Sequence, residues 1–169
     1  MPGHGRTTTD THHELPTVTA NEDELETDLA PFQALNQARI GMTGHLLFKA
    51  WDAEMPATLS PTIINDIIRK RIGFDGLLLT DDIDMEALDG TVPERAIAAH
   101  AAGCDIVLNC WAKMPDMVEI ADQLPAMDEM ALARLNKALE GTRVRDDIGE
   151  HAEMLAKRDR LLELAGEAA

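Results

Sequence analysis

The stretch Leu77-Leu78-Leu79-Thr80-Asp81-Asp82 decides the fold of this 169-residue chain. Its continuous apolar run, without alternation, predicts a strand that is buried on both faces, as in a parallel sheet. Two carboxylates follow at the carboxyl end of the run, where parallel α/β folds place their chemistry because the loops there open into a crevice. Capping of the next helix by Asp81 or Asp82 is the alternative interpretation, since aspartate is a frequent N-cap residue.

Strand-like and helix-like segments alternate on both sides of this stretch. Buried strands are predicted at residues 40–43, 76–80 and 105–109, and helices at 22–36, 60–72, 93–102 and 114–124. Such alternation predicts right-handed crossovers and a parallel sheet with helices outside it. After Pro125 the strands stop, and two charged helices are predicted near residues 127–140 and 150–165. We therefore divide the chain into residues 1–125 and a helical tail, residues 126–169, which we expect to pack on the outside of the preceding layers.

The composition excludes several classes of partner. A formal net charge of −16 and a pI of about 4.6 argue against binding to nucleic acid or to an anionic membrane surface. No apolar run approaches the length of a membrane span, and the first residues have no secretory signal pattern, so we expect a cytoplasmic protein. Cys104 and Cys110 match no metal or redox motif and are interpreted as reduced interior thiols.

The N-terminal loop contains a second candidate for chemistry, Asp10-Thr11-His12. A carboxylate two residues before a histidine can accept the Nδ1–H bond and leave Nε2 free as an acid or base. The alternative is a surface loop in which the two residues occur together by chance. A metal site built from Asp10, His4, His12 and His13 is a further alternative, but no helical His-x-x-x-His pair supports it, and we expect no metal and no cofactor.

Pleat geometry limits the role of the carboxylate pair. Neighbouring side chains on a strand point to opposite faces, so only one of Asp81 and Asp82 can face a central cavity. His45, at the end of the preceding strand, is expected to be a hydrogen-bonded structural histidine. The basic run Arg69-Lys70-Arg71 is expected to form a solvated face.

Several blocks of sequence, in the order in which they stand here, resemble β-N-acetylhexosaminidases of glycoside hydrolase family 3. They are Pro2-Gly3-His4-Gly5, Asp10-Thr11-His12, Met42-Thr43-Gly44-His45, the run from Arg69 to Gly76, Thr80-Asp81-Asp82-Ile83-Asp84-Met85, and Ala102-Gly103-Cys104-Asp105. The resemblance runs from Pro2 to about Asn109 and is weaker through the tail.

The resemblance implies a retaining exo-β-N-acetylglucosaminidase that acts on peptidoglycan fragments containing β-linked N-acetylglucosamine, as in cell-wall recycling in bacteria. It implies that Asp81 is the nucleophile, that His12 is the general acid/base and that Asp10 orients His12. Transfer of the sugar to phosphate is an alternative activity, because an imidazole does not repel phosphate as a carboxylate does. A metal-dependent hydrolase is a more distant alternative.

The family fold is a (β/α)₈ barrel, which needs about 250 residues. The resemblance therefore implies a partial barrel, from the loop after the fifth strand through the eighth helix, followed by the helical tail. The chain begins at Met1 where the family has a segment that follows a Lys-His pair, so we expect an N-terminally truncated chain that lacks most sugar-binding residues. The alternative is a non-catalytic fragment that needs a separate N-terminal half.

Overall fold

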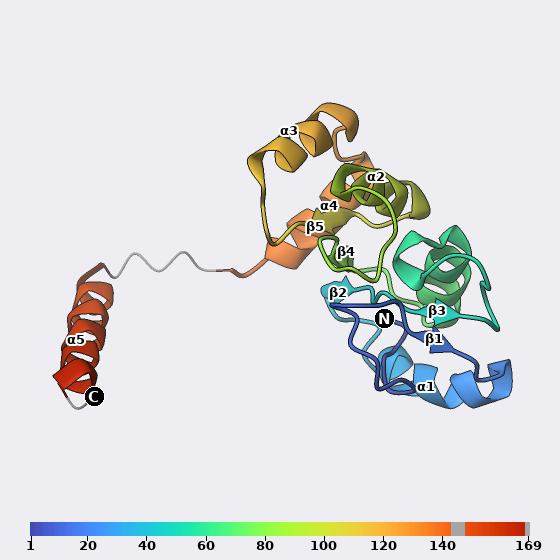
Figure 1. Cartoon of the computed structure of the whole chain (residues 1–169), viewed down its shortest axis with the longest axis horizontal. Coiled ribbons are helices and arrows are strands. Elements are labelled where there is room, and N and C mark those ends of the chain that lie inside the picture. The colour runs from blue at the N-terminus through green and yellow to red at the C-terminus, as the bar shows by residue number, and fades with distance from the viewer. Residues whose placement is uncertain (143–147, 168–169) are drawn as a thin grey trace. The chain divides into compact units, whose positions relative to one another are not determined.

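The computed structural model of the chain describes residues 1–142 and 148–167 (Figure 1). The chain divides into two compact units, Met1–Ala138 and Leu139–Ala169. The sheets and the predicted site residues all belong to the first unit. The division into residues 1–125 and 126–169 stays a prediction.

The central element of the first unit is a parallel sheet of three strands. Strand β4, Leu77–Asp82, lies between β2, Ile40–Met42, and β5, Ile106–Leu108. The pairs Met42↔Leu79 and Leu79↔Ile106 set the register, which shifts at a bulge before Asp82. The predicted mixed α/β fold with a parallel sheet is confirmed. Strand β4 is longer than expected and ends on the two aspartates themselves.

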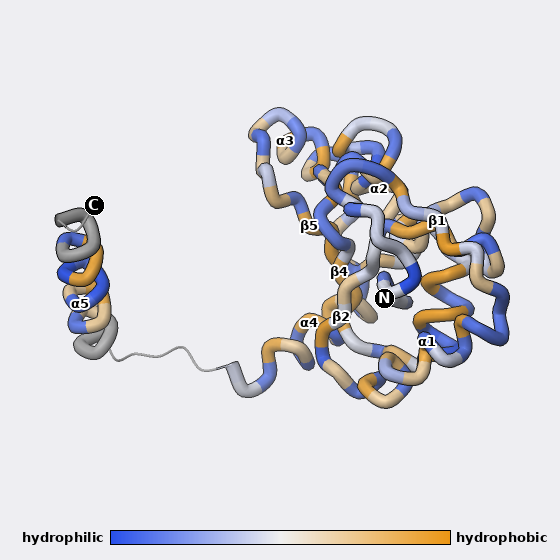
Figure 2. The backbone as a smooth tube through the Cα atoms, turned by 60° about the horizontal axis from the view of Figure 1, so that its bottom comes forward, coloured by the Kyte–Doolittle hydropathy of each residue, from blue (hydrophilic) through white to orange (hydrophobic). Residues whose placement is uncertain are grey.

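Helices lie between the strands and after the last of them, β5. They are α1 (Glu22–Ala34), the short 3-10 helix η1 (Ala57–Leu59), the π-helix η2 (Ile63–Arg71), α2 (Val92–Ala102), α3 (Met114–Gln123), α4 (Glu129–Leu139) and α5 (Ile148–Glu167). Helix α1 starts with a capping box between Asn21 and Glu24. Figure 2 shows hydrophilic and hydrophobic residues alternating along the coloured part of α5.

The segment after Ser60 differs from the expected α-helix. It is wound as a π-helix, in which the N–H of Ile72 donates to the carbonyl oxygen of Ile67 at 2.8 Å. The five-residue repeat places Ile67 and Ile72 on the same face, and both are buried. Ser60 still starts the segment as predicted, because its hydroxyl accepts the N–H of Ile63 at 3.1 Å.

A second, two-stranded sheet was not expected. Strand β1, Thr17–Val18, lies in the N-terminal stretch that the sequence predicts as a loop, and it pairs in parallel with β3, Leu47–Phe48, where no element was predicted. Each strand has only two residues, too few for alternation to be recognised in the sequence. This small sheet fixes the end of the N-terminal loop against the rest of the unit.

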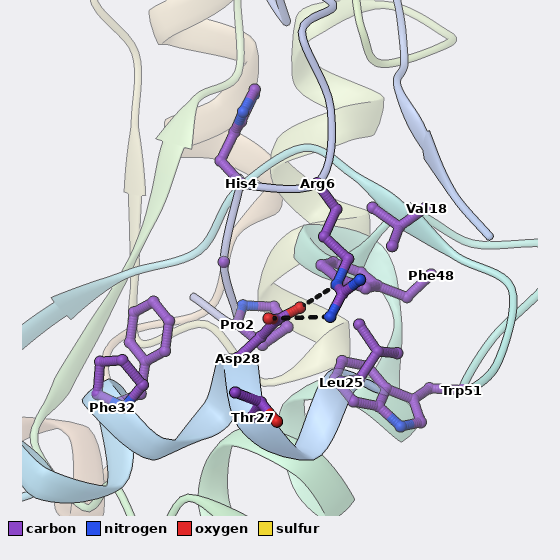
Figure 3. A pocket seen from close by; sticks show the side chains of 13 residues that line it. Pro2, His4, Arg6, Val18, Leu25, Thr27, Asp28, Phe32, Phe48 and Trp51 are labelled. Atoms are coloured by element: carbon purple, nitrogen blue, oxygen red, sulfur yellow. Dashed lines mark hydrogen bonds and ion pairs between the residues drawn. The ribbon is translucent and has the colours of Figure 1, made fainter. Parts of the chain in front are cut away.

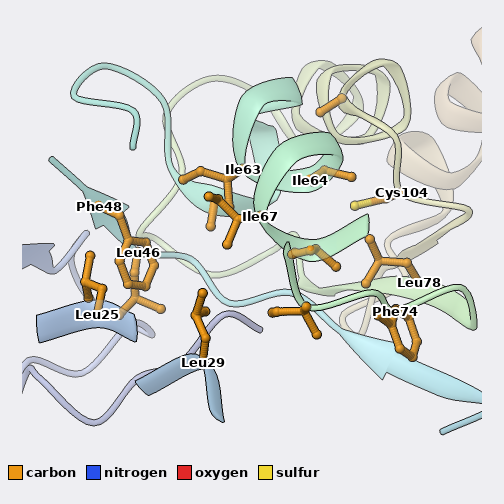
Figure 4. Close-up of a cluster of buried hydrophobic side chains, with 14 of the residues drawn as sticks. Leu25, Leu29, Leu46, Phe48, Ile63, Ile64, Ile67, Phe74, Leu78 and Cys104 are labelled. Carbon is orange, nitrogen blue, oxygen red and sulfur yellow. The ribbon is translucent and has the colours of Figure 1, made fainter. Parts of the chain in front are cut away.

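The hydrophobic core lies between η2, α1 and the sheet (Figure 4). Ile63 and Ile64 of η2 are completely buried, as is Leu78 on the helix-facing side of β4. Leu29 of α1 closes the opposite side of the cluster and is also completely buried. A helix is therefore found where residues 60–72 predict one, although it is a π-helix and not an α-helix.

The expected solvated face at 69–71 is wrong for two of its three residues. Arg69 is only 14% exposed in its side chain, donates to the carbonyl oxygen of Gly76 at 2.7 Å, and pairs with Asp105 at 2.8 Å. Arg134 of α4 contacts the other oxygen of Asp105 at 3.0 Å. Arg71 pairs with Glu26 of α1. The charges at 69 and 71 therefore hold η2 in place, since Arg69 pairs with Asp105 just before β5 and Arg71 pairs with Glu26 of α1.

Candidate active site

Three segments meet at the carboxyl edge of the three-stranded sheet. The loop after β4 is bonded to the end of β5, where the N–H of Ile83 donates to the carbonyl oxygen of Leu108 at 3.0 Å. The N-terminal loop joins them, because the N–H of Glu86 donates to the carbonyl oxygen of His12 at 3.2 Å. The sequence predicted site residues on two of these segments, and the fold brings the segments together.

Asp10 and His12 form a hydrogen-bonded pair in the N-terminal loop. The Nδ1 atom of His12 lies 2.7 Å from Oδ1 of Asp10, and the backbone N–H of His12 donates to the same oxygen at 2.9 Å. A carboxylate can only accept, so Nδ1 carries the proton and Nε2 is left free. Both side chains are more than half exposed.

The pair shifts the titration of both groups. The side-chain hydrogen bond and the charge of Asp10 raise the pKa of His12, with smaller contributions from Asp81 and Asp82. The backbone and side-chain N–H groups of His12 lower the pKa of Asp10. An imidazole with a raised pKa keeps its proton to higher pH, which suits a group that must donate one near neutrality.

Asp81 and Asp82 have different surroundings. Oδ1 of Asp81 accepts the N–H of Asp82 at 2.9 Å, and among the described residues no other group donates a hydrogen bond to this side chain. Oδ1 of Asp82 accepts the N–H groups of Asp84 at 3.1 Å and Cys110 at 3.0 Å. Burial would raise the pKa of Asp82, but these N–H groups outweigh burial and lower it. Asp82 therefore holds two loops together.

Neither aspartate caps the following helix. The N-cap of α2 is Thr91, whose hydroxyl accepts the N–H of Glu94 in a capping box. The capping interpretation of Asp81 and Asp82 is therefore wrong, because a nine-residue loop separates β4 from α2.

His45 is a structural histidine, as the sequence suggested. It is completely buried, with Nδ1 2.8 Å from the hydroxyl of Thr58 and Nε2 2.9 Å from the carbonyl oxygen of Asp82. Nε2 must donate to that carbonyl, so Nδ1 accepts from Thr58. Burial lowers the pKa of His45, although the carbonyl of Asp82 opposes the effect. The neutral ring fixes the end of β4 next to Asp81.

Two residues of the site were missed in the sequence. Asp84 is 8% exposed and accepts the N–H of Trp111 at 3.0 Å, which ties the loop after β5 to the loop after β4. Arg95 of α2 donates to the carbonyl oxygens of Ile83 at 2.9 Å and Met85 at 3.1 Å. Their partners are backbone groups, so no spacing of side-chain types in the sequence points to them.

The cysteines are only partly as expected. Cys104 is buried, and burial raises its pKa to about 12. Cys110 is exposed, which corrects the prediction that both thiols are interior.

In the described parts of the chain, no group of three or more His, Cys, Asp or Glu side chains is arranged to hold a metal ion. Within those same parts, no helix is long and apolar enough to cross a membrane.

A pocket of about 400 Å³ lies away from this edge, between the start of the N-terminal loop and α1 (Figure 3). Apolar side chains such as Phe48 and Trp51 line it, and the ion pair of Arg6 with Asp28 crosses it. Asp10, His12 and Asp81 are not among its lining residues. The candidate active site therefore lies at the carboxyl edge of the sheet and not in this pocket.

These features define a parallel α/β protein with an imidazole–carboxylate pair and a strand-end aspartate at the carboxyl edge of its sheet. The sequence matches the glycosyl hydrolase family 3 N terminal domain over residues 1–144. The chain therefore belongs to glycoside hydrolase family 3.

Curated relatives carry the name β-hexosaminidase. The protein from Chromobacterium violaceum is 45% identical over 114 residues, which cover 64% of this chain and 32% of the relative. That from Alkalilimnicola ehrlichii is 39% identical over 145 residues, covering 80% of this chain and 41% of the relative. The matches thus span only 32% and 41% of the length of these two relatives.

Solved structures agree with the family. A glycoside hydrolase family 3 β-N-acetylglucosaminidase from Paenibacillus sp. str. FPU-7 superposes with a TM-score of 0.74 at 32% identity, over 85% of this chain and 31% of that one. NagZ from Neisseria gonorrhoeae, in complex with N-trifluoroacetyl-D-glucosamine, superposes with a TM-score of 0.70 at 31% identity. That match covers 99% of this chain and 49% of the other.

Proposed function

We propose that this chain carries the reacting groups of a retaining exo-β-N-acetylglucosaminidase that acts on peptidoglycan fragments in the cytoplasm. The observation that carries the proposal is the His12–Asp10 pair, bonded at 2.7 Å in a loop that the N–H of Glu86 ties to the strand-end loop after Asp81. The names of the β-hexosaminidase relatives support the substrate class.

The proposed reaction has two steps. A carboxylate oxygen of Asp81 attacks the anomeric carbon, the bond from that carbon to the leaving oxygen breaks, and the charged ring of His12, protonated on both nitrogens, gives its Nε2 proton to the leaving oxygen. In the second step Nε2 takes a proton from water, the water oxygen bonds to the anomeric carbon, and Asp81 is released. Two inversions at the same carbon retain its configuration.

The proposed roles fit the local geometry. Asp10 fixes the Nδ1–H tautomer of His12 and stabilises the charged ring, so that Nε2 is free to move the proton. Asp82 accepts two backbone N–H groups, from the loops after β4 and β5, whereas Asp81 accepts only that of its neighbour Asp82 among the described residues. Asp81 is therefore the better nucleophile of the two.

The outer strands β2 and β5 favour a second, related proposal, in which further strands pair with them and complete the candidate active site. On β2, Ile40 is 54% exposed and Met42 is 41% exposed, and neither β2 nor β5 has a second neighbouring strand among the described residues. Three strands cannot close a barrel, and exposed edges pair readily with other strands. We propose that this chain is part of a (β/α)₈ barrel and that a separate N-terminal half supplies the other strands and sugar-binding residues.

Hydrolysis of an aryl N-acetyl-β-glucosaminide tests both proposals. We expect little release of the aryl group by the chain alone, and release restored by co-expression with the N-terminal part of a β-hexosaminidase relative. Loss of the restored activity in His12→Gln, with folding retained, supports the role of His12. Full activity of His12→Gln would contradict it. Product analysis with and without phosphate separates hydrolysis from transfer to phosphate.

Substitution of Ile40 by lysine tests the open edge. Ile40→Lys should leave the free energy of unfolding of the chain within about 0.5 kcal/mol, because the side chain is exposed. It should also prevent restoration of activity by the N-terminal part. Normal restoration in Ile40→Lys would contradict pairing at this edge.

A further inference from the structure

The loop between β4 and α2 is largely buried, although it is neither helix nor strand. Ile83 is completely buried, and Met85 is 6% exposed. A buried backbone carbonyl needs a hydrogen-bond donor. Arg95 of α2 supplies one to each of these residues, because its Nη1 atom lies 2.9 Å from the carbonyl oxygen of Ile83 and 3.1 Å from that of Met85. The guanidinium thus holds the first half of the loop against α2.

One peptide group links Arg95 to His12. The carbonyl of Met85 and the N–H of Glu86 belong to the same peptide bond, which is planar. The carbonyl oxygen accepts from Arg95, and the N–H donates to the carbonyl oxygen of His12 at 3.2 Å. The direction of the N–H therefore follows from that of the carbonyl. A cationic donor on the carbonyl also polarises the peptide group and strengthens the bond that its N–H donates.

The bond from Glu86 attaches the part of the N-terminal loop that carries Asp10 and His12. Among the described residues it is the one hydrogen bond that joins residues 7–14 to any residue outside 1–16, since the others of this segment stay within the loop. The exposed imidazole–carboxylate pair thus depends on one peptide group for its position relative to β4.

The end of β4 is fixed independently of Arg95. The peptide group between Asp82 and Ile83 is also bonded on both sides, since its carbonyl oxygen accepts from His45 at 2.9 Å and its N–H donates to the carbonyl oxygen of Leu108 at 3.0 Å. His45 and β5 therefore hold the strand end next to Asp81, whereas Arg95 holds the attachment of the N-terminal loop.

Arg95 is not arranged for stability alone. Its Nε atom is buried and has no hydrogen-bond partner among the described residues. A buried donor without a partner costs stability. A guanidinium that is retained at this cost, and whose two hydrogen bonds both go to the loop beside the candidate active site, is suited to a role in positioning that loop.

We propose that Arg95 is a positioning residue for the reaction, which holds the Met85–Glu86 peptide group so that the N-terminal loop presents Nε2 of His12 to the leaving oxygen at Asp81. This inference rests on the proposed function, in which His12 is the proton donor. Loss of Arg95 should weaken proton donation more than it weakens attack by Asp81, because the strand end keeps its own hydrogen bonds.

The dependence of kcat/KM on the leaving group tests the inference in the chain co-expressed with the N-terminal part of a β-hexosaminidase relative. Phenol is a poor leaving group that needs a proton, whereas dinitrophenol leaves without one. In Arg95→Gln, kcat/KM should fall about fiftyfold for the phenyl N-acetyl-β-glucosaminide and less than about fivefold for the dinitrophenyl compound.

Two further variants complete the comparison. Arg134→Gln removes a buried guanidinium that pairs with Asp75 and Asp105, and it should leave the ratio of the two kcat/KM values unchanged. Arg95→Lys keeps the charge but not the geometry of the guanidinium, so it should change the ratio in the same direction by about threefold. It serves as the test variant if Arg95→Gln does not fold.

Hydrogen exchange of the Glu86 amide, followed by NMR, measures the attachment without catalysis. Exchange at Glu86 should be about tenfold faster in Arg95→Gln than in the unaltered chain. The amide of Ile83, which donates to Leu108, is the control within the same sample and should keep its exchange rate. Equal acceleration at both amides would show general loosening of the fold and would overturn the inference.

The outcomes separate this inference from the proposed function. Equal loss of kcat/KM with both leaving groups in a folded Arg95 variant, or unchanged exchange at Glu86, overturns the inference. His12→Gln should itself lose activity mainly with the phenyl compound. If it does and Arg95→Gln does not, only the inference fails. If His12→Gln shows no such difference, the proposed role of His12 fails, and faster exchange at Glu86 in Arg95→Gln still supports the attachment of the loop by Arg95.

Discussion

Asp10 accepts two hydrogen bonds from His12 through one oxygen, from the ring Nδ1 at 2.7 Å and from the backbone N–H at 2.9 Å. The two residues are only two positions apart, so the turn that joins them sets both the position and the tautomer of the ring. Removing the charge of Asp10 should therefore change the titration of His12 directly.

In Asp10→Asn the pKa of His12 should fall, because the side-chain hydrogen bond and charge of Asp10 are the largest causes of its increase. An NMR titration of the His12 ring protons measures the change without any need for catalysis. Asp23→Asn, in the first turn of α1, is the control and should leave the pKa of His12 unchanged. A His12 titration that is the same in Asp10→Asn and in the unaltered chain would show that the pair has no electrostatic effect.

His45 predicts a dependence of stability on pH. Burial lowers its pKa in the folded chain below the unfolded value of 6.5, so the unfolded chain binds more protons near that pH. The stabilising contribution of His45 is therefore present above pH 6.5 and is lost as the pH falls through the folded pKa. In His45→Gln this acid-side loss should disappear from the free energy of unfolding, measured by urea denaturation across the pH range.

The same denaturation experiment has a built-in control. His13→Gln should keep the acid-side loss, because the side chain of His13 is exposed in the N-terminal loop. An identical pH dependence in His45→Gln and the unaltered chain would rule out a buried neutral His45.

Arg134 should contribute strongly to the stability of the first unit. Its guanidinium is 15% exposed and contacts both Asp75, at 2.8 Å, and Asp105, which is 6% exposed. Arg134→Gln should lower the free energy of unfolding by about 3 kcal/mol, because it leaves a buried carboxylate with one cation fewer.

The control for Arg134 is an exposed ion pair of similar length. Lys70 pairs with Asp66 at 2.7 Å, but its side chain is 74% exposed. Lys70→Gln should therefore change the free energy of unfolding by less than about 0.5 kcal/mol. Equal losses in the two variants would show that burial does not determine the value of these pairs.

The sequence predicts those elements whose signals are local. The apolar run at 77–79, the serine and proline at 60–61 and the glycine at 103 each indicate a strand or a helix end, and the elements are found there. The asparagine at 21 does the same for α1. These residues act through their own backbone or nearest neighbours, so the pattern is visible without the fold.

The features that were missed or wrong depend on distant partners. Arg69 looks like part of a basic surface until Asp105, far along the chain, is brought against it. Asp84 acts through the backbone of Trp111, which leaves no trace in residue type. The roles of Asp10, His12 and Asp81 come from the resemblance to the family, and they stay predictions, since geometry alone shows the pair and not the reaction.

The most direct test of the account is covalent labelling of Asp81. The chain, co-expressed with the N-terminal part of a β-hexosaminidase relative, is treated with a fluorinated N-acetylglucosaminide that accumulates the glycosyl-enzyme, and peptides are analysed by mass spectrometry. We predict one sugar adduct, on Asp81, that is absent in Asp81→Asn and still forms in Asp82→Asn if that variant folds. An adduct on Asp82 or any other residue, or hydrolysis that continues unlabelled in Asp81→Asn, would contradict the account.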